Sequence, residues 1–179
     1  MNILSKLFTF FLVFALIAPL SVSQAETLKL KMVFVPASEK GDDQDYVTLI
    51  KIIGELTGIE ITPIRVTDYN AAVEAVRANR AQIAWYGGKT YIQAVEIANV
   101  EAFAAGVRKG DTDASYFAYF VVPSDSDIQT LADIKGKKLA LNSIGSTSGD
   151  LIPQVELMKA GLSIKNKNDF KQVYYAGSH

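Results

Sequence analysis

From residue 28 onward, hydrophobic residues alternate between two kinds of spacing along the chain. Short apolar runs rich in Val, Ile, Phe and Tyr predict strands, and apolar residues three or four positions apart predict helices. In the first half, the predicted strands are 28–35, 59–66, 82–85 and 101–107, and the predicted helices are 45–56, one starting at Asp68, and 89–98. Gly58 is expected to end the first of these helices.

The second half continues the alternation after a charged loop at 108–114. Here the predicted strands are 116–122, 138–141 and 172–175, the predicted helices are 131–134 and 150–160, and 142–149 is a loop of small residues. Strands that alternate with helices through short turns predict a mainly parallel sheet with helices on both faces. The pattern therefore indicates an α/β protein.

The first 25 residues follow a different pattern, typical of a cleavable signal peptide. Lys6 precedes an apolar run at 7–20, and Ser23-Gln24-Ala25 forms a cleavage site with small residues at its first and third positions. A membrane anchor is the alternative, but the run is shorter than the roughly 20 apolar residues that cross a bilayer. We therefore expect export to the periplasm, with cleavage after Ala25.

Composition excludes several classes of function. The 179 residues carry a formal net charge of -1, which gives no basic surface for nucleic acid. The chain has no cysteine, so disulfides, thiol nucleophiles and a lipid-modified cysteine are excluded. His179 is the single histidine, and the carboxylates show no metal-ligand spacing. We therefore expect no metal and no cofactor. We also expect no enzymatic activity, because no Ser-His-Asp set can be assembled with confidence.

The segment Ser143-Ile144-Gly145-Ser146-Thr147-Ser148-Gly149 lies between a predicted strand and a predicted helix. Small residues allow close approach of a ligand to the backbone, and a helix start presents free N–H groups to an anion. Three successive hydroxyls, at residues 146–148, add further donors. The segment predicts a site for a tetrahedral oxyanion, although a capped helix with a solvated loop would have the same composition.

Two tyrosines are placed at the edge of the predicted sheet where ligands of α/β proteins bind. Tyr86 follows the strand at 82–85, and Tyr69 follows the preceding strand and opens a helix. A phenol there can donate a hydrogen bond to an anion without adding charge. Packing at a helix start is the alternative for Tyr69, and packing in the core is the preferred interpretation for Trp85.

Several of these segments recur in the same order in one known family. The chain resembles the phosphate, phosphite and phosphonate-binding components of ABC transporters, the PhnD-like family. The resemblance lies in Thr67-Asp68-Tyr69, Gln82-Ile83-Ala84-Trp85-Tyr86-Gly87, Gly145-Ser146-Thr147-Ser148-Gly149 and Gly177-Ser178-His179. The stretch at 131–137 is similar to the start of the second lobe in type-2 periplasmic binding proteins, and the likeness runs from residue 28 to 179.

The resemblance implies a two-lobed, Venus-flytrap fold with mainly parallel sheets and a ligand between the lobes. It places a signal peptide at 1–25, lobe one at 26–119 and an incomplete lobe two at 120–179, because family members continue past this point. By position, the ligand-binding residues would be Tyr69 and Tyr86 from lobe one, and Ser146, Thr147, Ser148 and His179 from lobe two.

The implied function is capture of a phosphonate, phosphite or phosphate for a membrane permease and its ATPase. The complete protein would be a monomer, and we expect the chain that stops at His179 not to be a functional receptor. Two alternatives stay open: a ligand-sensing domain of the same fold, and a receptor for another small anion such as sulfate or a carboxylate. The sequence does not select the substituent on phosphorus.

Overall fold

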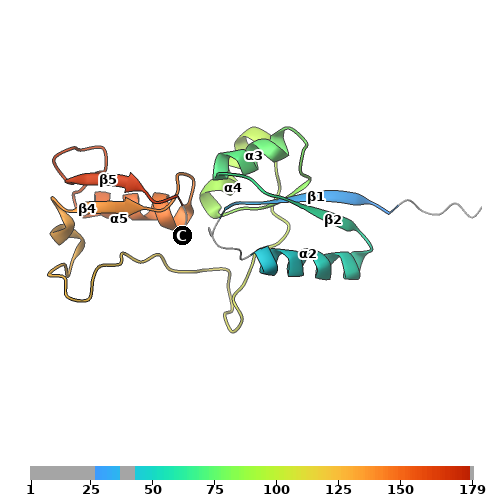
Figure 1. Ribbon diagram of the computed structural model, residues 1–179, viewed down its shortest axis with the longest axis horizontal. Helices are drawn as coiled ribbons and strands as arrows, with labels where there is room; N and C mark the ends of the chain where they lie inside the picture. Colours follow the sequence, from blue (N-terminus) through green and yellow to red (C-terminus); the bar gives the residue numbers. More distant parts are fainter. Residues whose placement is uncertain (1–26, 37–42, 178–179) are drawn as a thin grey trace, which may run out of the picture.

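The computed structural model describes residues 27–36 and 43–177 and contains two separate sheets (Figure 1). We call residues 29–98, around the three-stranded sheet, the first unit, and residues 131–177, around the two-stranded sheet, the second unit. The predicted signal peptide at 1–25 and His179 lie outside the described residues.

The sheet of the first unit is parallel throughout. Its strands are β1 (Lys29–Phe34), β2 (Glu60–Ile64) and β3 (Ile83–Trp85), in the order β2-β1-β3. In the register of the sheet, Val33 of the central strand lies opposite Ile64 on one side and Ala84 on the other. Parallel strands need a crossover, which is supplied here by α2 (Asp43–Thr57) and α3 (Tyr69–Arg77).

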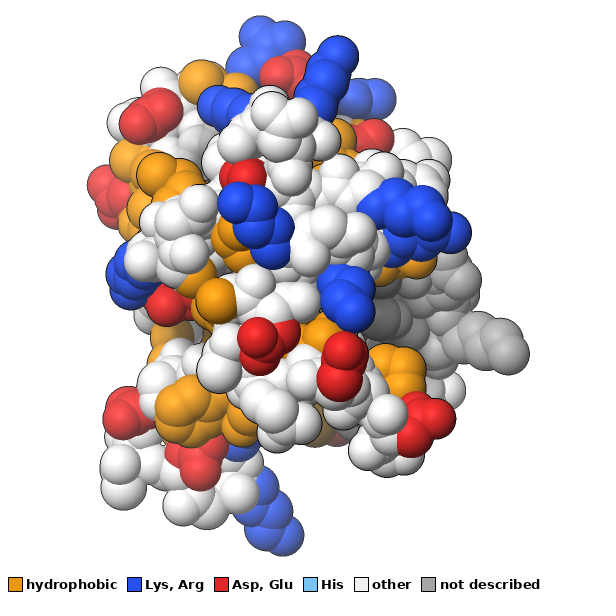
Figure 2. Space-filling view, turned by 90° about the vertical axis from the view of Figure 1, so that its left-hand side faces the viewer, with side chains coloured by type: hydrophobic (Ala, Val, Ile, Leu, Met, Phe, Trp, Pro, Cys, Tyr) orange, Lys and Arg blue, Asp and Glu red, His pale blue; other side chains and the backbone are white. Residues whose placement is uncertain are grey.

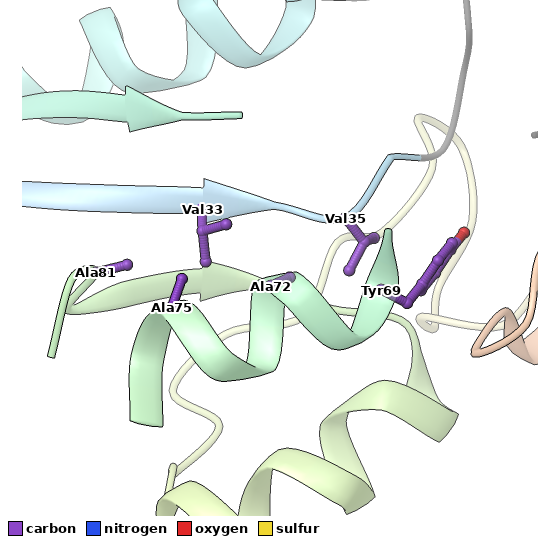
Figure 3. Packing of buried hydrophobic residues seen from close by; sticks show 6 residues of the cluster. All are labelled: Val33, Val35, Tyr69, Ala72, Ala75 and Ala81. Carbon is purple, nitrogen blue, oxygen red and sulfur yellow. The ribbon is translucent and has the colours of Figure 1, made fainter. Parts of the chain in front are cut away.

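Alternate residues of β1 face opposite sides of this sheet, and a helix covers each side. Val33 and the following Val35 pack against Tyr69, Ala72 and other residues of α3 (Figure 3). Met32 and Phe34 form a second cluster with the apolar residues of α2, where the Phe34 and Tyr46 rings stack with centroids 4.1 Å apart. Because both faces are covered, the strands can be apolar along their whole length.

The sequence correctly predicted the cap at the start of α3 and the glycine that follows α2. Asp68 caps α3, accepting a hydrogen bond from the Ala71 N–H at 2.8 Å. Gly58 follows α2 with a φ of +70° and donates its N–H to the Gly54 carbonyl. The last helix of the unit, α4 (Gly88–Ala98), ends at Asn99 in the left-handed conformation and lies beside α3 (Figure 1).

The second unit is smaller and has its own core. Its elements are the 3₁₀ helix η1 (Leu131–Ile134), β4 (Lys138–Leu141), the π-helical turn η2 (Thr147–Leu151), α5 (Ile152–Lys159) and β5 (Gln172–Tyr175). The strands β4 and β5 are parallel, as predicted. Ile134, Leu157, Leu162 and Phe170 form the buried cluster between the sheet and the helices. On the outer face of this unit, positive and negative side chains are interspersed (Figure 2).

Two predicted strands, 101–107 and 116–122, are wrong. Residues 99–130, which connect the two units, contain no helix or strand, and those at 101–122 are all exposed. An apolar run becomes a strand only where the edge of a sheet pairs its N–H and C=O groups, so strand propensity depends on context. Neither segment meets such an edge within the described part of the chain.

Candidate functional site

The loop after β4 folds into a tight turn that leads into a helix. Ser146 is the N-cap, and its Oγ accepts a hydrogen bond from the Gly149 N–H at 3.0 Å. Gly145, with a φ of +98°, adopts a backbone conformation that disfavours a side chain. The Ser143 hydroxyl donates to the Gly177 carbonyl and fixes the base of the loop to the segment after β5. We call residues 143–150 the oxyanion loop, after the site that the sequence predicts there.

The oxyanion loop lies directly against the start of α3 in the first unit. A Cβ added to Gly145 would stand 2.6 Å from the Tyr69 Cβ, so only glycine fits at this contact. Tyr69 is 3% exposed, and its side chain hydrogen-bonds with Ser146. Burial raises the pKa of the Tyr69 phenol above its usual value, and the bond to Ser146 partly opposes this shift. Two of the predicted site residues are therefore in direct contact.

A second contact joins the loop to the start of α4. The Lys89 N–H donates to the Thr147 Oγ1 at 2.9 Å, and the buried Thr90 hydroxyl donates to the Gly145 carbonyl at 2.9 Å. A Cβ added to Gly87 would stand 3.0 Å from the Thr147 Oγ1. The first N–H groups of a helix lack partners within the helix, and here one of them binds the loop. Thr147 is thus held at the first unit.

An ion pair adjoins these contacts. The Lys89 Nζ lies 2.5 Å from the Asp150 Oδ2, and Asp150 is 1% exposed. The Tyr175 hydroxyl and the Gln154 Nε2 donate to its other oxygen, Oδ1, at 2.8 and 2.5 Å. Burial raises the pKa of Asp150, but the hydrogen bonds from Lys89 and Tyr175 and the Lys89 charge outweigh burial and keep it below its usual value. The carboxylate is therefore ionised at neutral pH.

Sequence reasoning did not find this cluster of Lys89, Asp150, Gln154 and Tyr175. Lys89 and Asp150 are separated by 61 positions, and neither stands in a pattern that predicts a partner. Asp150 is an acidic residue in the first turn of a helix. Negative side chains are favourable at the start of any helix, so its position does not indicate a cationic partner. Tyr175 ends a strand and was predicted only as part of that strand.

Tyr86 is placed differently from the other predicted site residues. Its hydroxyl donates to the Ala72 carbonyl of α3 at 3.1 Å, inside the first unit. Burial raises the pKa of Tyr86 to about 12. The structure thus brings Tyr69, Ser146 and Thr147 together and leaves the Tyr86 hydroxyl on a helix carbonyl. Trp85, for which core packing was expected, is 39% exposed.

The last two predicted residues are Ser148 and His179. Ser148 is partly exposed, and within residues 27–36 and 43–177 its hydroxyl has no hydrogen-bond partner. It follows Thr147 in the first turn of η2, so its hydroxyl is available to a ligand at the helix start. His179 lies outside the described residues.

The described residues also bear on metal binding and on membrane insertion. No group of three or more His, Cys, Asp or Glu residues among the described residues is placed to hold a metal ion. Across the described ranges, every helix is too short or too polar to span a bilayer. The oxyanion loop therefore presents hydroxyl and backbone N–H groups beside one ionised carboxylate, that of Asp150, whose charge is paired with Lys89.

Comparisons with known proteins identify the family of the chain. Residues 32–179 match the sequence profile of the family described as ABC transporter, phosphonate, periplasmic substrate-binding protein. The phosphonates-binding periplasmic protein of Escherichia coli K12 is 32% identical over 67% of this chain. A Prochlorococcus marinus MIT 9301 protein named "Probable ABC transporter phosphite binding protein PhnD1" is 30% identical over 76% of it. The chain spans only 36% and 47% of the lengths of these two relatives.

A solved structure supports the same fold. The binding-protein component of an ABC phosphonate transporter from Pseudomonas aeruginosa superposes with a TM-score of 0.72, at 24% identity. The match covers 86% of this chain and 52% of the other. It confirms the predicted type-2 periplasmic binding protein fold, of which this chain forms a part. With the profile match over most of its length, the chain belongs to the family of periplasmic substrate-binding proteins of phosphonate ABC transporters.

Proposed function

We propose that the protein is the solute-binding component of an ABC transporter and that it binds a phosphonate, phosphite or phosphate at the oxyanion loop. The observation that carries the proposal is the contact of this loop with the starts of α3 and α4 in the first unit. Tyr69 of α3 hydrogen-bonds with Ser146, and the first turn of α4 binds Thr147. A ligand held by the loop would therefore also be held by the first unit.

The hydrogen-bond directions at the loop suit an anion. A hydroxyl has one proton to donate and two lone pairs that accept. Thr147 accepts from the Lys89 N–H, which leaves its proton available, and the Ser148 hydroxyl is unpaired within the described residues. A fully ionised oxyanion can only accept hydrogen bonds, so it can use both protons. Hydrogen bonds to charged groups contribute about 1.5–3 kcal/mol each.

The proposed ligand residues are those that the sequence predicted: Tyr69, Tyr86, Ser146, Thr147, Ser148 and His179. Tyr86 could donate to an anion only by giving up its bond to the Ala72 carbonyl. Asp150 would repel an oxyanion, but the Lys89 ammonium at 2.5 Å balances its charge. The site needs no basic surface, because its donors are local.

The family supports a proposal for the partners and the location. The relatives are named for phosphonate and for phosphite binding, and the Escherichia coli protein is named as periplasmic. We therefore propose a periplasmic protein that delivers its ligand to a membrane permease with an associated ATPase. The complete protein acts as a monomer and binds no nucleic acid.

Replacing Thr147 with Asp tests the proposed site. The substitution Thr147→Asp keeps an acceptor for the Lys89 N–H but places a negative charge beside the ligand. We expect calorimetric titration of the full-length protein to show no measurable binding of methylphosphonate, because the two like charges repel. Phosphate, phosphite, 2-aminoethylphosphonate and sulfate, titrated in parallel, define which anion the unchanged protein prefers.

The matched control is Thr112→Asp, in the exposed loop far from either helix start in the sequence. It adds the same charge and should leave the affinity unchanged. Full binding by the Thr147→Asp protein would overturn the assignment of the oxyanion loop. Preference for sulfate over every phosphorus compound would overturn the proposed ligand class.

A further inference from the structure

Asp150 is a buried carboxylate whose donors come from both units. The Tyr175 hydroxyl and the Gln154 Nε2, both of the second unit, bind its Oδ1. The Gly145 N–H points to Oδ2 at 3.4 Å, within the oxyanion loop itself. These three donors are neutral. Among the described residues, Lys89 of the first unit supplies the one cation that pairs with it.

The position of Asp150 makes this pairing strong. The side chain is 2% exposed, so its charge is poorly screened by water, whereas the Lys89 side chain remains 30% exposed. Removing the cation would leave the carboxylate charged and buried without a partner. This strongly destabilises the conformation in which Asp150 is buried, because no solvent replaces the lost partner. Surface ion pairs such as Lys159–Glu156, in contrast, contribute little.

Lys89 is also fixed at its backbone. Its N–H binds the Thr147 Oγ1 at 2.9 Å, and its neighbour Thr90 binds the Gly145 carbonyl at 2.9 Å. One turn of α4 thus touches the oxyanion loop at three points, namely Gly145, Thr147 and Asp150. Each contact is made directly between protein groups, so none requires a bridging molecule.

We propose that Lys89 and Asp150 form a clasp between the two units that holds the oxyanion loop on the start of α4 and positions the Thr147 hydroxyl. Both are positioning residues: they act through the loop. The clasp joins the units through protein contacts alone, so it is independent of which anion the protein binds.

Distances between spin labels in the full-length protein test the clasp without any ligand. None of these 179 residues is cysteine, so Glu96→Cys on α4 and Lys165→Cys in the second unit add two attachment sites on exposed residues, and any cysteine elsewhere in the full-length protein is first replaced with Ser. In the otherwise unchanged protein we expect a single narrow distance distribution. Lys89→Met and Asp150→Asn should each broaden it and shift it to longer distances.

Two further variants separate the clasp from general damage. Lys89→Arg keeps the charge and should retain the narrow distribution. Lys159→Met breaks a surface pair with an N–O distance of 2.7 Å and should leave the distribution unchanged. Lys89 lies in the first turn of α4, and its side chain is partly exposed. We therefore expect Lys89→Met to preserve the circular dichroism of the folded protein, even if Asp150→Asn does not.

A narrow, unshifted distribution in Lys89→Met protein with native circular dichroism would overturn the clasp. A broadened distribution in both Lys89→Arg and Lys159→Met would overturn it as well, because the loss would then not follow the charge. These measurements use no anion, so they decide the clasp separately from the proposed binding of phosphorus compounds.

Discussion

Gly145 lies at a close contact between the two units. Its φ of +98° and its contact with the Tyr69 side chain each favour glycine for a different reason. The positive φ would strain the backbone of any other residue, and the contact leaves no room for a Cβ beside Tyr69. Gly136, with a φ of +76°, has the same kind of backbone strain, but an added Cβ would meet nothing within 4 Å.

These two glycines allow the contact to be measured. We expect Gly136→Ala to lower the free energy of unfolding by about 1–2 kcal/mol, the usual cost of a left-handed conformation. Gly145→Ala should cost more, because its Cβ would overlap Tyr69 and push the oxyanion loop away from α3. Urea unfolding of both variants gives the comparison. Equal losses would mean that the contact with Tyr69 contributes nothing.

The residues of the site were predictable only in part. Ser146, Thr147 and Tyr69 stand in local patterns, a small-residue loop and a capped helix start, and local patterns can be read from the sequence. The Lys89–Asp150 pair has no such pattern, since it depends on how the units dock. The bond from the Tyr86 hydroxyl to the Ala72 carbonyl likewise depends on the packing of β3 against α3.

At the scale of elements, the start of α3 does two things at once. Asp68 caps the helix through the Ala71 N–H, and the next residue, Tyr69, contacts the oxyanion loop. Any fraying of the first turn would therefore move Tyr69. The cap is exposed, but the residue that it positions is buried.

Removing the cap should destabilise this turn. We expect Asp68→Ala to lower the free energy of unfolding by about 0.5–2 kcal/mol, the usual contribution of an N-cap side chain. Asp68→Ser, which also accepts from the backbone, should restore most of it. Thermal unfolding of the three proteins measures the difference. A stable Asp68→Ala protein would show that the packing of α3 alone fixes its start.

The elements themselves were largely predictable. The helices and the strands β1 to β5 have their own periodicity and end signals, such as Asp68 and Gly58, and were predicted within a few residues. The strands predicted at 101–107 and 116–122 failed because a strand needs a partner, and a partner is not a local property. Both segments have the apolar pattern of a strand, but residues 99–130 contain no strand.

At the scale of the whole molecule, the connection between the units exposes an apolar face. Phe117, Tyr119 and Val121 are 77%, 79% and 88% exposed. The Phe117 and Tyr119 rings lie beside each other, with centroids 6.3 Å apart, and we call these two residues and Val121 the apolar row. Contiguous apolar surface of this kind favours association with other molecules.

Replacing two residues of this row should reduce that association. For a chain of this sequence we expect a Phe117→Ser, Tyr119→Ser double variant to bind less of a hydrophobic fluorescent dye and to sediment with less oligomer. Leu56→Ser, which removes a side chain 82% exposed at the end of α2, serves as the control and should change neither. Unaltered dye binding by the double variant would mean that the row is covered in solution.

The connection also determines how strong the contact between the units must be. Because residues 99–130 join them in one chain, docking is intramolecular, and the length of this connection sets the effective concentration of one unit at the other. An interface with an intrinsic dissociation constant well below that effective concentration would then stay closed, as the single narrow distance distribution expected above requires. A change at position 89 or 150, or in the length of the tether, could therefore shift the balance between open and closed protein by severalfold, without any change in the groups that touch the anion.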